Sequence, residues 1–338
     1  MSDDIRRIVE LYRTMVRIRA FENAAEAASQ GGVSAFGKAA DGRAKVRGPL
    51  HLSTGQEAVP AGVCAHLQRD DYLTSTHRGH GHTLAKGADL QRMMGELFGK
   101  ATGFNGGKGG SMHIADFSVG MLGANGVVAA GLPIAVGAAH AQKIQRRDGI
   151  TACFFGDGAI NRGPFLESLN WARVFELPVL FVCEDNRWSA TTASGSMTAG
   201  GGAAARSLSL GIPAVQVDGN DVLAVHAAAS MLVQDVRSGK GPRLLHAITY
   251  RVKGHVSVDL AAYRAPRELQ DALETDPIAR ARGRYLAMPG ADARTLDAIE
   301  REAKAEVDAA LAVAEAAPWP DAAAAFTDVQ TTGRGQWR

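Results

Sequence analysis

Residues 151–170 read TACFFGDGAINRGPFLESLN, in which a short apolar run ends at a Gly-Asp-Gly tripeptide and a helical pattern follows. Apolar runs of this length that end at glycine are typical of buried strands. The stretch therefore predicts a strand, a tight turn that carries Asp157, and a helix over 164–176. A chain with 39 glycines contains such a tripeptide easily, so the rest of the sequence must give Asp157 its meaning.

The alternation of strand and helix continues on both sides of this stretch. Alternating elements with short apolar strands predict an α/β fold in which a mainly parallel sheet is covered by helices on both faces. Ligands of such sheets bind beyond the C-terminal ends of the strands. The expected elements are helices near 132–146 and 221–238, strands at 178–185, 214–219 and 242–252, and a long loop over 187–211.

Helical periodicity also marks the N-terminal part of the chain, where a first helix is expected over 4–28. The stretch STGQEAVPAGVCAHLQ, 53–68, predicts a second helix, with Ser53 or Thr54 as N-cap and Glu57 completing a capping box. A short strand and then a loop rich in Gly and His are expected in DDYLTSTHRGHGHTLAKGAD, which ends at Asp89.

The C-terminal part has one apolar helical stripe on an otherwise charged segment, which predicts a packing helix. We expect a single domain over 1–338, with a core at about 50–260, a C-terminal helical part at about 267–318 and a tail at 319–338. The stripe consists of Leu296, Ile299, Ala303, Val307 and Leu311.

The composition is that of an ordinary soluble protein. The 37 basic and 35 acidic residues are scattered, which argues against nucleic acid and against an anionic membrane surface as partners. Cys64, Cys153 and Cys183 lie far apart, as buried thiols in a reducing compartment do. The start MSDDIRRIVE has the features of neither a signal peptide nor a transit peptide, so we expect a cytoplasmic protein.

The least polar stretch, Gly126–Ala141, is too short and too rich in Gly and Ala to span a bilayer about 30 Å thick. Its small side chains favour a helix that is buried against another helix, either within this chain or in another subunit.

Asn186 ends the strand that follows Asp157 in the alternating pattern, so both side chains are expected at the same edge of the sheet. A carboxylate and an amide oxygen suit Mg²⁺ better than zinc, and the main-chain oxygen of Trp188 could be a third ligand. The alternative is structural: Asp157 would cap the following helix, and Asn186 would sit in a turn. Spacing alone leaves both open.

The order Gly-Asp-Gly and then Asp185-Asn186 resembles the thiamin-diphosphate fingerprint, in which two asparagines are usual at the second place. Further motifs, in order, resemble the alpha subunit of the first component of 2-oxo acid and acetoin dehydrogenase complexes, over nearly the whole chain. His-Arg-Gly-His-Gly-His, MHIAD and MLGANG are most similar to the acetoin branch. The motifs are PLHLSTGQEA (49–58), THRGHGHTLAKG (76–87), GGKGGSMHIAD (106–116), GANGVVAAGLPIAVGAA (123–139) and TYRVKGH (249–255).

This resemblance implies the thiamin-diphosphate-binding fold, with thiamin diphosphate and Mg²⁺ as cofactors. Without it, each matching residue has an ordinary structural reading, as a turn glycine, a core side chain or a helix start. The implied roles are diphosphate contacts for His77, Arg78, Gly158 and Ala159, aminopyrimidine contacts for Gly126 and Val128, and Mg²⁺ ligation by Asp157, Asn186 and the Trp188 carbonyl.

The resemblance also implies two catalytic histidines. His255 would reach the reacting carbon of the cofactor, and a proton-shuttling imidazole there should titrate near neutral pH. His51 would lie at the substrate pocket, and His113 near the substrate funnel. Val256 stands where the mitochondrial pyruvate enzymes have a regulated serine, so we expect no control by phosphorylation there. Ordinary loop histidines remain the alternative reading.

Other motif readings are less favourable. Three interleaved histidines, His77, His80 and His82, lack nearby Cys or carboxylate ligands for a metal cluster. GGKGGSMH lacks the first Gly and the final Ser or Thr of a phosphate-binding loop, and GANGVVAAG does not match a dinucleotide fingerprint. The stretch 37–48, GKAADGRAKVRG, has no assignable role.

The function implied is that of an alpha subunit that cleaves acetoin, releases acetaldehyde and passes the two-carbon unit to a lipoyl-bearing acyltransferase. Pyruvate or a branched-chain 2-oxo acid is the alternative substrate. A noncatalytic protein that binds a Mg-nucleotide or diphosphate is the alternative of another class. In this family a separate beta subunit supplies an essential glutamate, so we expect an α2β2 heterotetramer and an inactive isolated chain.

Overall fold

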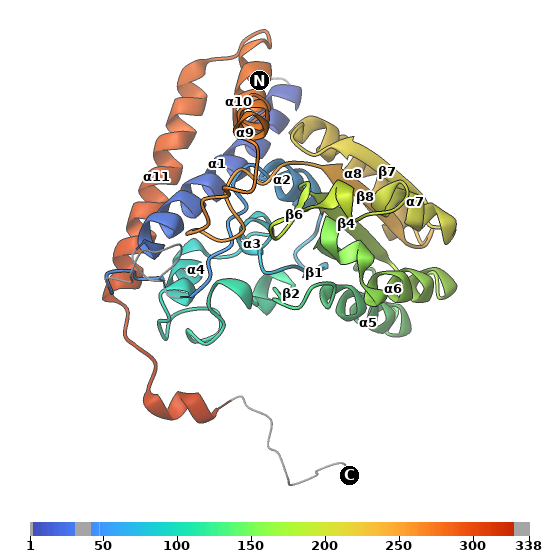
Figure 1. Cartoon of the computed structure of the whole chain (residues 1–338), viewed down its shortest axis with the longest axis horizontal. Helices are drawn as coiled ribbons and strands as arrows, with labels where there is room; N and C mark the ends of the chain where they lie inside the picture. The colour runs from blue at the N-terminus through green and yellow to red at the C-terminus, as the bar shows by residue number, and fades with distance from the viewer. Residues whose placement is uncertain (1–2, 31–41, 47, 328–338) are drawn as a thin grey trace.

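The computed structural model describes residues 3–30, 42–46 and 48–327, and a six-stranded sheet lies at its centre (Figure 1). The strand order is β2-β1-β3-β4-β8-β7, and all neighbouring strands are parallel. The predicted α/β fold with a parallel sheet is confirmed. The strands are β1 (Tyr72–Thr74), β2 (Met121–Gly123), β3 (Thr151–Gly156), β4 (Val179–Asp185), β7 (Ala214–Asp218) and β8 (Arg243–Ile248).

Helices cover both faces of the sheet because successive strand residues point to opposite sides. In β3, Cys153 and Phe155 belong to one apolar core, while Ala152 and Phe154 belong to the other. The first core is covered by α5 (Gly131–Ile144), α6 (Gly163–Val174) and α7 (Gly202–Ser209). The second is covered by α2 (Ala58–Cys64), α4 (Leu90–Leu97), α8 (Val222–Arg237), α1 (Asp3–Ser29) and α11 (Ala293–Ala316).

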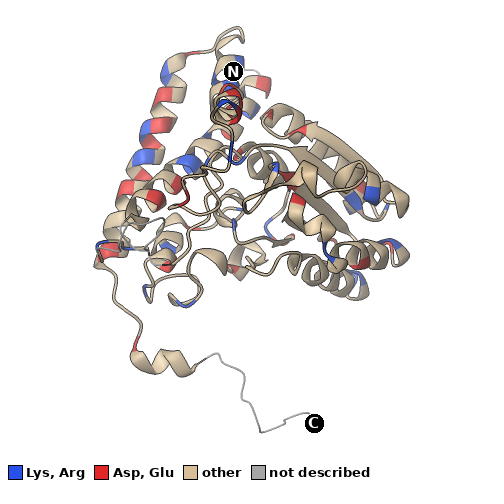
Figure 2. Cartoon of the chain, viewed as in Figure 1, with Lys and Arg blue, Asp and Glu red and all other residues tan. Residues whose placement is uncertain are grey.

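Two C-terminal helices, α10 (Pro277–Leu286) and α11, lie against α1 (Figure 1). The predicted stripe of α11 faces inward: its first four members are buried and Leu311 is half-buried. The outer surface of α11 alternates in charge (Figure 2), and Arg17 of α1 pairs with Glu306 of α11 at 2.7 Å. The stripe therefore fixes α11 to the body of the protein. Two shorter helices precede it, α9 (Pro266–Leu273) and α10.

The predicted capping box at the second helix is wrong. That helix, α2, begins only at Ala58, and Ser53 donates from its hydroxyl to the buried Glu22 at 2.6 Å instead of capping. Glu57 accepts from the main-chain nitrogen of Gly55 and pairs with Arg19. Because Glu57 is fully buried, the tertiary ion pair replaces the local cap.

Two expected loops contain regular structure. The Gly and His loop includes α3 (His80–Ala85), where both His80 and His82 are buried. The expected loop 187–211 contains an antiparallel hairpin, β5 (Trp188–Ser189) and β6 (Thr192–Ala193), followed by the 3₁₀ helix η4 (Ser194–Ser196) and by α7. Short polar elements without apolar periodicity are held by tertiary contacts, which a local pattern does not show.

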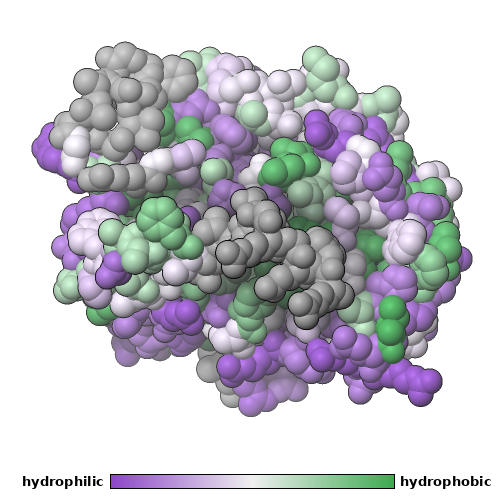
Figure 3. Space-filling model, turned by 90° about the horizontal axis from the view of Figure 1, so that it is seen from below, coloured by the Kyte–Doolittle hydropathy of each residue, from purple (hydrophilic) through white to green (hydrophobic). Residues whose placement is uncertain are grey.

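The expected helix at Gly126–Ala141 is right only in part, because α5 starts at Gly131 and the preceding residues form a turn. Its outer surface is also not buried within the chain. Several apolar side chains of α5 and α6 are exposed, and hydrophobic residues are scattered among hydrophilic ones on the face seen from below (Figure 3). They are Ile134, Ile144, Leu166, Trp171 and Val174.

The three cysteines are free and buried, as expected. Within the described residues, no helix has the combination of length and apolar character needed to cross a membrane. Half of the unassigned stretch 37–48, namely 37–41 and 47, and the tail beyond Thr327 lie outside the described residues.

Candidate active site

A cavity of about 230 Å³ opens at the C-terminal ends of β1, β3 and β4. Every residue that the sequence assigned to cofactor binding, metal ligation or catalysis lines this cavity, although these residues come from segments that are far apart in the chain. The structure therefore brings the whole predicted set together. The set is His51, His77, Arg78, Gly126, Val128, Asp157, Gly158, Ala159, Asn186, Trp188 and His255.

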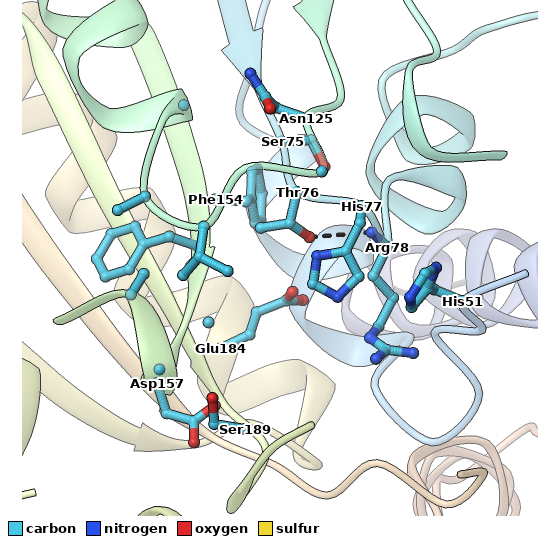
Figure 4. A pocket seen from close by; sticks show the side chains of 18 of the residues that line it. His51, Ser75, Thr76, His77, Arg78, Asn125, Phe154, Asp157, Glu184 and Ser189 are labelled. Atoms are coloured by element: carbon cyan, nitrogen blue, oxygen red, sulfur yellow. Dashed lines mark hydrogen bonds between the residues drawn. The ribbon is translucent and has the colours of Figure 1, made fainter. Parts of the chain in front are cut away.

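The cavity has two ends that differ in chemistry (Figure 4). Asp157 lies beside Ser189 at one end, which we call the oxygen end. We include Asn186 and Trp188 in it because they line the cavity and follow β4, the strand that pairs with β3. The other, which we call the imidazole end, contains His51, His77 and His255. The Glu184 carboxylate lies between the two ends in the close-up view.

Asp157 is the central group of the oxygen end. It is the first residue of the 3₁₀ helix η3 (Asp157–Asn161) directly after β3, and it is 4% exposed. Its Oδ2 atom has no hydrogen-bond partner. Burial, and then the charge of Asp185, raise the pKa of Asp157 to about 6. A buried carboxylate oxygen without a partner is costly, so this position fits a bound cation.

Asn186 and Trp188 complete the oxygen end from the neighbouring strand. Asn186 follows β4, and its Nδ2 donates to Gln56 Oε1 at 3.0 Å. Its Oδ1 accepts from the Trp188 main-chain nitrogen at 3.2 Å. The Trp188 carbonyl accepts from Arg251 at 3.3 Å, which leaves one lone pair. These oxygens, with Asp157, fit a hard cation such as Mg²⁺.

The structural alternative, a helix cap at Asp157 and a turn at Asn186, holds for Asn186 but not for Asp157. The helix that follows Asp157, α6, has Arg162 at its N-cap position, so Asp157 does not cap it. The Asn186 side chain does bond within its turn, as the alternative supposed. That bond also fixes which end of the amide faces the turn, so the two readings of Asn186 are compatible.

Gly158 is required by the close approach of the hairpin. A Cβ atom at this position would overlap the Ser189 hydroxyl and lie 3.0 Å from the Ser189 Cβ. Ala159 follows and is buried. At Gly126, by contrast, a Cβ would make only ordinary van der Waals contacts, at 3.6 Å to His113 and 3.9 Å to Met112, so no protein neighbour demands glycine there. Val128 lies at the cavity mouth and is 46% exposed.

The imidazole end is a cluster of three rings. The ring centroid of His51 lies 4.5 Å from that of His77 and 4.8 Å from that of His255. Arg78 lies beside them and is fixed by a 2.6 Å bond from its Nη1 to the Leu52 carbonyl. Burial, and then the charge of Arg251, lower the pKa of Arg78 to about 9. Two buried guanidinium groups therefore give this end a positive field that fits an anion.

That field also acts on the histidines. Burial, and then the charges of Arg78 and Arg251, lower the pKa of His255 to about 4. Burial likewise lowers the pKa of His77 to about 3 and that of His51 to about 2. The expectation that His255 titrates near neutral pH is thus not met by the chain on its own, in which all three imidazoles are neutral. Burial of the His255 ring, and then the two guanidinium charges beside it, are the physical reason.

Sequence reasoning missed Arg251, which is 1% exposed and lines the cavity. It donates to the carbonyls of Trp188 and Ala190 and to the Tyr263 hydroxyl, and so joins the hairpin to the loop of His255. Its place within the TYRVKGH motif was the available signal. A buried arginine is not recognisable from a local pattern, because arginine is usually exposed.

His77, His80 and His82 do not face one common position in the described part of the chain. His80 bonds to Glu22 and to Ser111, at 3.0 Å each, within the protein. His82 bonds to Ser75 and pairs with Glu184 at 3.1 Å. Only His77 of the three reaches the cavity. His113 is exposed and does not line the cavity, although its ring lies close to Gly126.

Comparison with known proteins shows the family of this chain. Residues 35–323 match the model of the dehydrogenase E1 component family. The alpha subunit of the acetoin:2,6-dichlorophenolindophenol oxidoreductase of Bacillus subtilis is 42% identical over 94% of this chain and 92% of its own length. The corresponding subunit of Cupriavidus necator is 45% identical over 85% of this chain and 87% of its own.

Pyruvate enzymes are similar as well. The alpha subunit of the pyruvate dehydrogenase E1 component of Rhizobium meliloti is 37% identical over 95% of this chain and 89% of its own length. The family typically uses thiamin diphosphate and Mg²⁺, which the oxygens of Asp157 and Asn186 and the guanidinium group of Arg78 fit. The chain therefore belongs to the dehydrogenase E1 component family, as an alpha subunit of an oxidoreductase.

Proposed function

We propose that this chain is the alpha subunit of an acetoin dehydrogenase that uses thiamin diphosphate and Mg²⁺. One observation carries the proposal: the residues that match the family's cofactor and catalytic motifs all line a single cavity at the C-terminal edge of the sheet. Acetoin is favoured as the substrate because the relatives named for acetoin are 42% and 45% identical, against 37% for the pyruvate enzyme of Rhizobium meliloti.

In this proposal Asp157, Asn186 and the Trp188 carbonyl hold Mg²⁺ at the oxygen end. The diphosphate is bound by Arg78 and His77 and by the main-chain nitrogens at Gly158 and Ala159, which start a helical turn. Gly126 and Val128 contact the aminopyrimidine ring. When bound, the cofactor supplies a nucleophilic carbon and an electron sink for cleavage of a carbon–carbon bond.

The histidines of the imidazole end move protons in the proposed reaction. His255 exchanges a proton at the reacting carbon, and His51 exchanges a proton at the substrate oxygen. A diphosphate bound at Arg78 would offset the positive field and raise the pKa values of both rings toward neutrality. Cofactor binding would therefore favour proton exchange by these imidazoles.

A beta subunit completes the proposed enzyme as an α2β2 heterotetramer, and a lipoyl-bearing acyltransferase takes up the two-carbon unit. Two surface features support a partner chain next to the cavity. Val127 and Val128 at its mouth are 65% and 46% exposed, and the apolar surface of α5 and α6 adjoins that turn. Apolar patches of this kind are typical of protein interfaces.

The test is an assay of the chain alone and together with its beta subunit, using acetoin, pyruvate and branched-chain 2-oxo acids with an artificial electron acceptor. We expect turnover only from the pair, with the highest kcat/KM for acetoin. A higher kcat/KM for pyruvate would assign the runner-up substrate. Turnover by the chain alone would refute the shared active site.

Calorimetry separates the noncatalytic alternative. Thiamin diphosphate with Mg²⁺ is expected to bind to the chain or to the pair, and nucleotides with Mg²⁺ are not. Binding of nucleotides in place of thiamin diphosphate would contradict the proposal.

A further inference from the structure

We propose that His51, His77 and His255 form a binding site for a divalent transition-metal ion of the zinc type, at the opposite end of the cavity from Asp157. One ring nitrogen of each side chain lies within 4.8 Å of those of the other two. Imidazole nitrogen is a preferred ligand of zinc, whereas Mg²⁺ prefers oxygen. The inference stands on this geometry and not on the proposed activity.

The arrangement of the rings suits a shared ion. The three centroid distances are 4.5, 4.8 and 5.6 Å, and the planes cross at 69°, 76° and 63°. The nitrogens around a tetrahedral zinc ion, with bonds of about 2.1 Å, are about 3.4 Å apart. Because the rings meet edge to face and do not stack, small rotations about χ2, which is a soft torsion in histidine, bring the nitrogens to that spacing.

The lone pairs needed for such bonds are available. His51 is 5% exposed, and its Nδ1 atom is buried without a hydrogen-bond partner. The contact that His255 Nδ1 receives from Arg251 is 3.5 Å long, at the outer limit of a hydrogen bond. An unpartnered nitrogen in a buried ring is costly, and a metal ion satisfies it.

The surrounding charges decide how strongly the ion is held. The Arg78 and Arg251 guanidinium groups lie 3.4 and 3.5 Å from atoms of His255, and they oppose a cation. Asp259 accepts from the His255 main-chain nitrogen at 2.7 Å, and Glu184 lines the same cavity. A hydroxide or chloride ion as fourth ligand would lower the charge further. We therefore expect a reversible site that a chelator empties.

An ion at this end would occupy the space between the two proposed catalytic histidines. Zn²⁺ would consequently inhibit the enzyme, while Mg²⁺ at the oxygen end would not.

The test is calorimetric titration of the full chain, purified without an oligohistidine tag, with Zn²⁺ in an excess of Mg²⁺. One Zn²⁺ per chain is expected. Co²⁺ in its place is expected to show the visible absorption of a tetrahedral ion with nitrogen ligands. His51→Gln, His77→Gln and His255→Gln should each lower the association constant by at least about 100-fold, because removing a direct ligand exceeds the effect of removing an outer-sphere partner.

Two variants serve as controls, and circular dichroism checks the folding of each. His226→Gln alters the other close histidine pair, in which the His66 and His226 rings are 4.2 Å apart, and Asp157→Asn alters the oxygen end. Both should bind Zn²⁺ as the unaltered chain does. If Zn²⁺ fails to bind, is displaced by Mg²⁺, or is lost in either control but kept in the histidine variants that fold, the proposal is overturned.

Discussion

The oxygen end of the cavity is carried by the sheet, whereas the imidazole end is carried by loops. Asp157 and Asn186 follow β3 and β4, which pair in parallel up to Gly156 and Glu184. His51, His77 and His255 follow no shared ladder; they come from the segment before α2 and from the segments after β1 and β8. Main-chain hydrogen bonds therefore set the oxygen end.

The imidazole end depends on buried side chains in place of a ladder. Arg78 bonds to the Leu52 carbonyl beside His51, and Arg251 contacts both the β5 hairpin and His255. The Ser257 main-chain nitrogen also donates to the Leu50 carbonyl at 2.8 Å. The difference teaches that the groups of the oxygen end are placed by the fold itself, and that the groups of the imidazole end are placed by tertiary contacts between loops.

The largest effect is expected at the oxygen end. Asp157→Asn should weaken binding of thiamin diphosphate with Mg²⁺ by more than about 100-fold, since losing one partner of a buried charge pair costs about 3–5 kcal/mol. Calorimetry measures it. Asp218→Asn is the matched control, because Asp218 ends β7 and pairs outside the cavity with Arg280. Equal losses in both variants would contradict the assignment.

A different kind of loss is expected at the imidazole end. His255→Asn should lower kcat of the reconstituted enzyme by roughly 100-fold, the usual share of one proton-transfer group, with cofactor affinity changed only a few-fold. Steady-state kinetics and calorimetry together give this result. A variant that loses the cofactor yet keeps its turnover when saturated would show that His255 binds and does not catalyse.

The contact between the strand end and the hairpin is expected to show a smaller effect. Gly158→Ala should destabilise the chain by about 1–3 kcal/mol and weaken cofactor binding roughly tenfold, because its Cβ overlaps Ser189. A second substitution in the same chain, Ser189→Gly, should restore most of the lost stability and most of the lost cofactor affinity. Thermal melting of the two single variants and the double variant measures the coupling; simple additivity would mean that the overlap is relieved elsewhere.

The smallest effect concerns a histidine pair outside the cavity. Burial, and then the charge of His66, lower the pKa of His226 to about 4, below the value of about 6.5 in an unfolded chain. The contribution of His226 to the free energy of unfolding is therefore complete above about pH 6.5 and is lost as the pH falls toward 4. The free energy of unfolding falls as the solution becomes acidic, and His226→Gln should make this fall smaller by less than about 1 kcal/mol, because His226 is half-buried.

Melting curves at about pH 7.5 and pH 5 measure this change. A variant as acid-sensitive as the unaltered chain would show that the loss comes from other groups, with the imidazole end as the next to examine.

The sequence by itself determined five of the six strands of the sheet and the residues at its edge, whereas β2 lies in a Gly-rich segment for which no strand was expected. Apolar runs such as TACFF are local signals, because a strand that is buried on both faces must be apolar throughout. The positions of Asp157 and Asn186 then followed from parallel order alone. The motifs also indicated the family, and the matching model over 35–323 confirms it.

Only the tertiary structure decided how the loops meet. It joined His77 to His51 and His255 and not to His80 and His82, and it turned Glu57 from a helix cap into the partner of Arg19. It also buried His255, which lowers the pKa of that ring, and placed the charges of Arg78 and Arg251 beside it, which lower the pKa further. Burial and charge proximity depend on segments far apart in the chain, which hydrophobic periodicity within one segment does not encode.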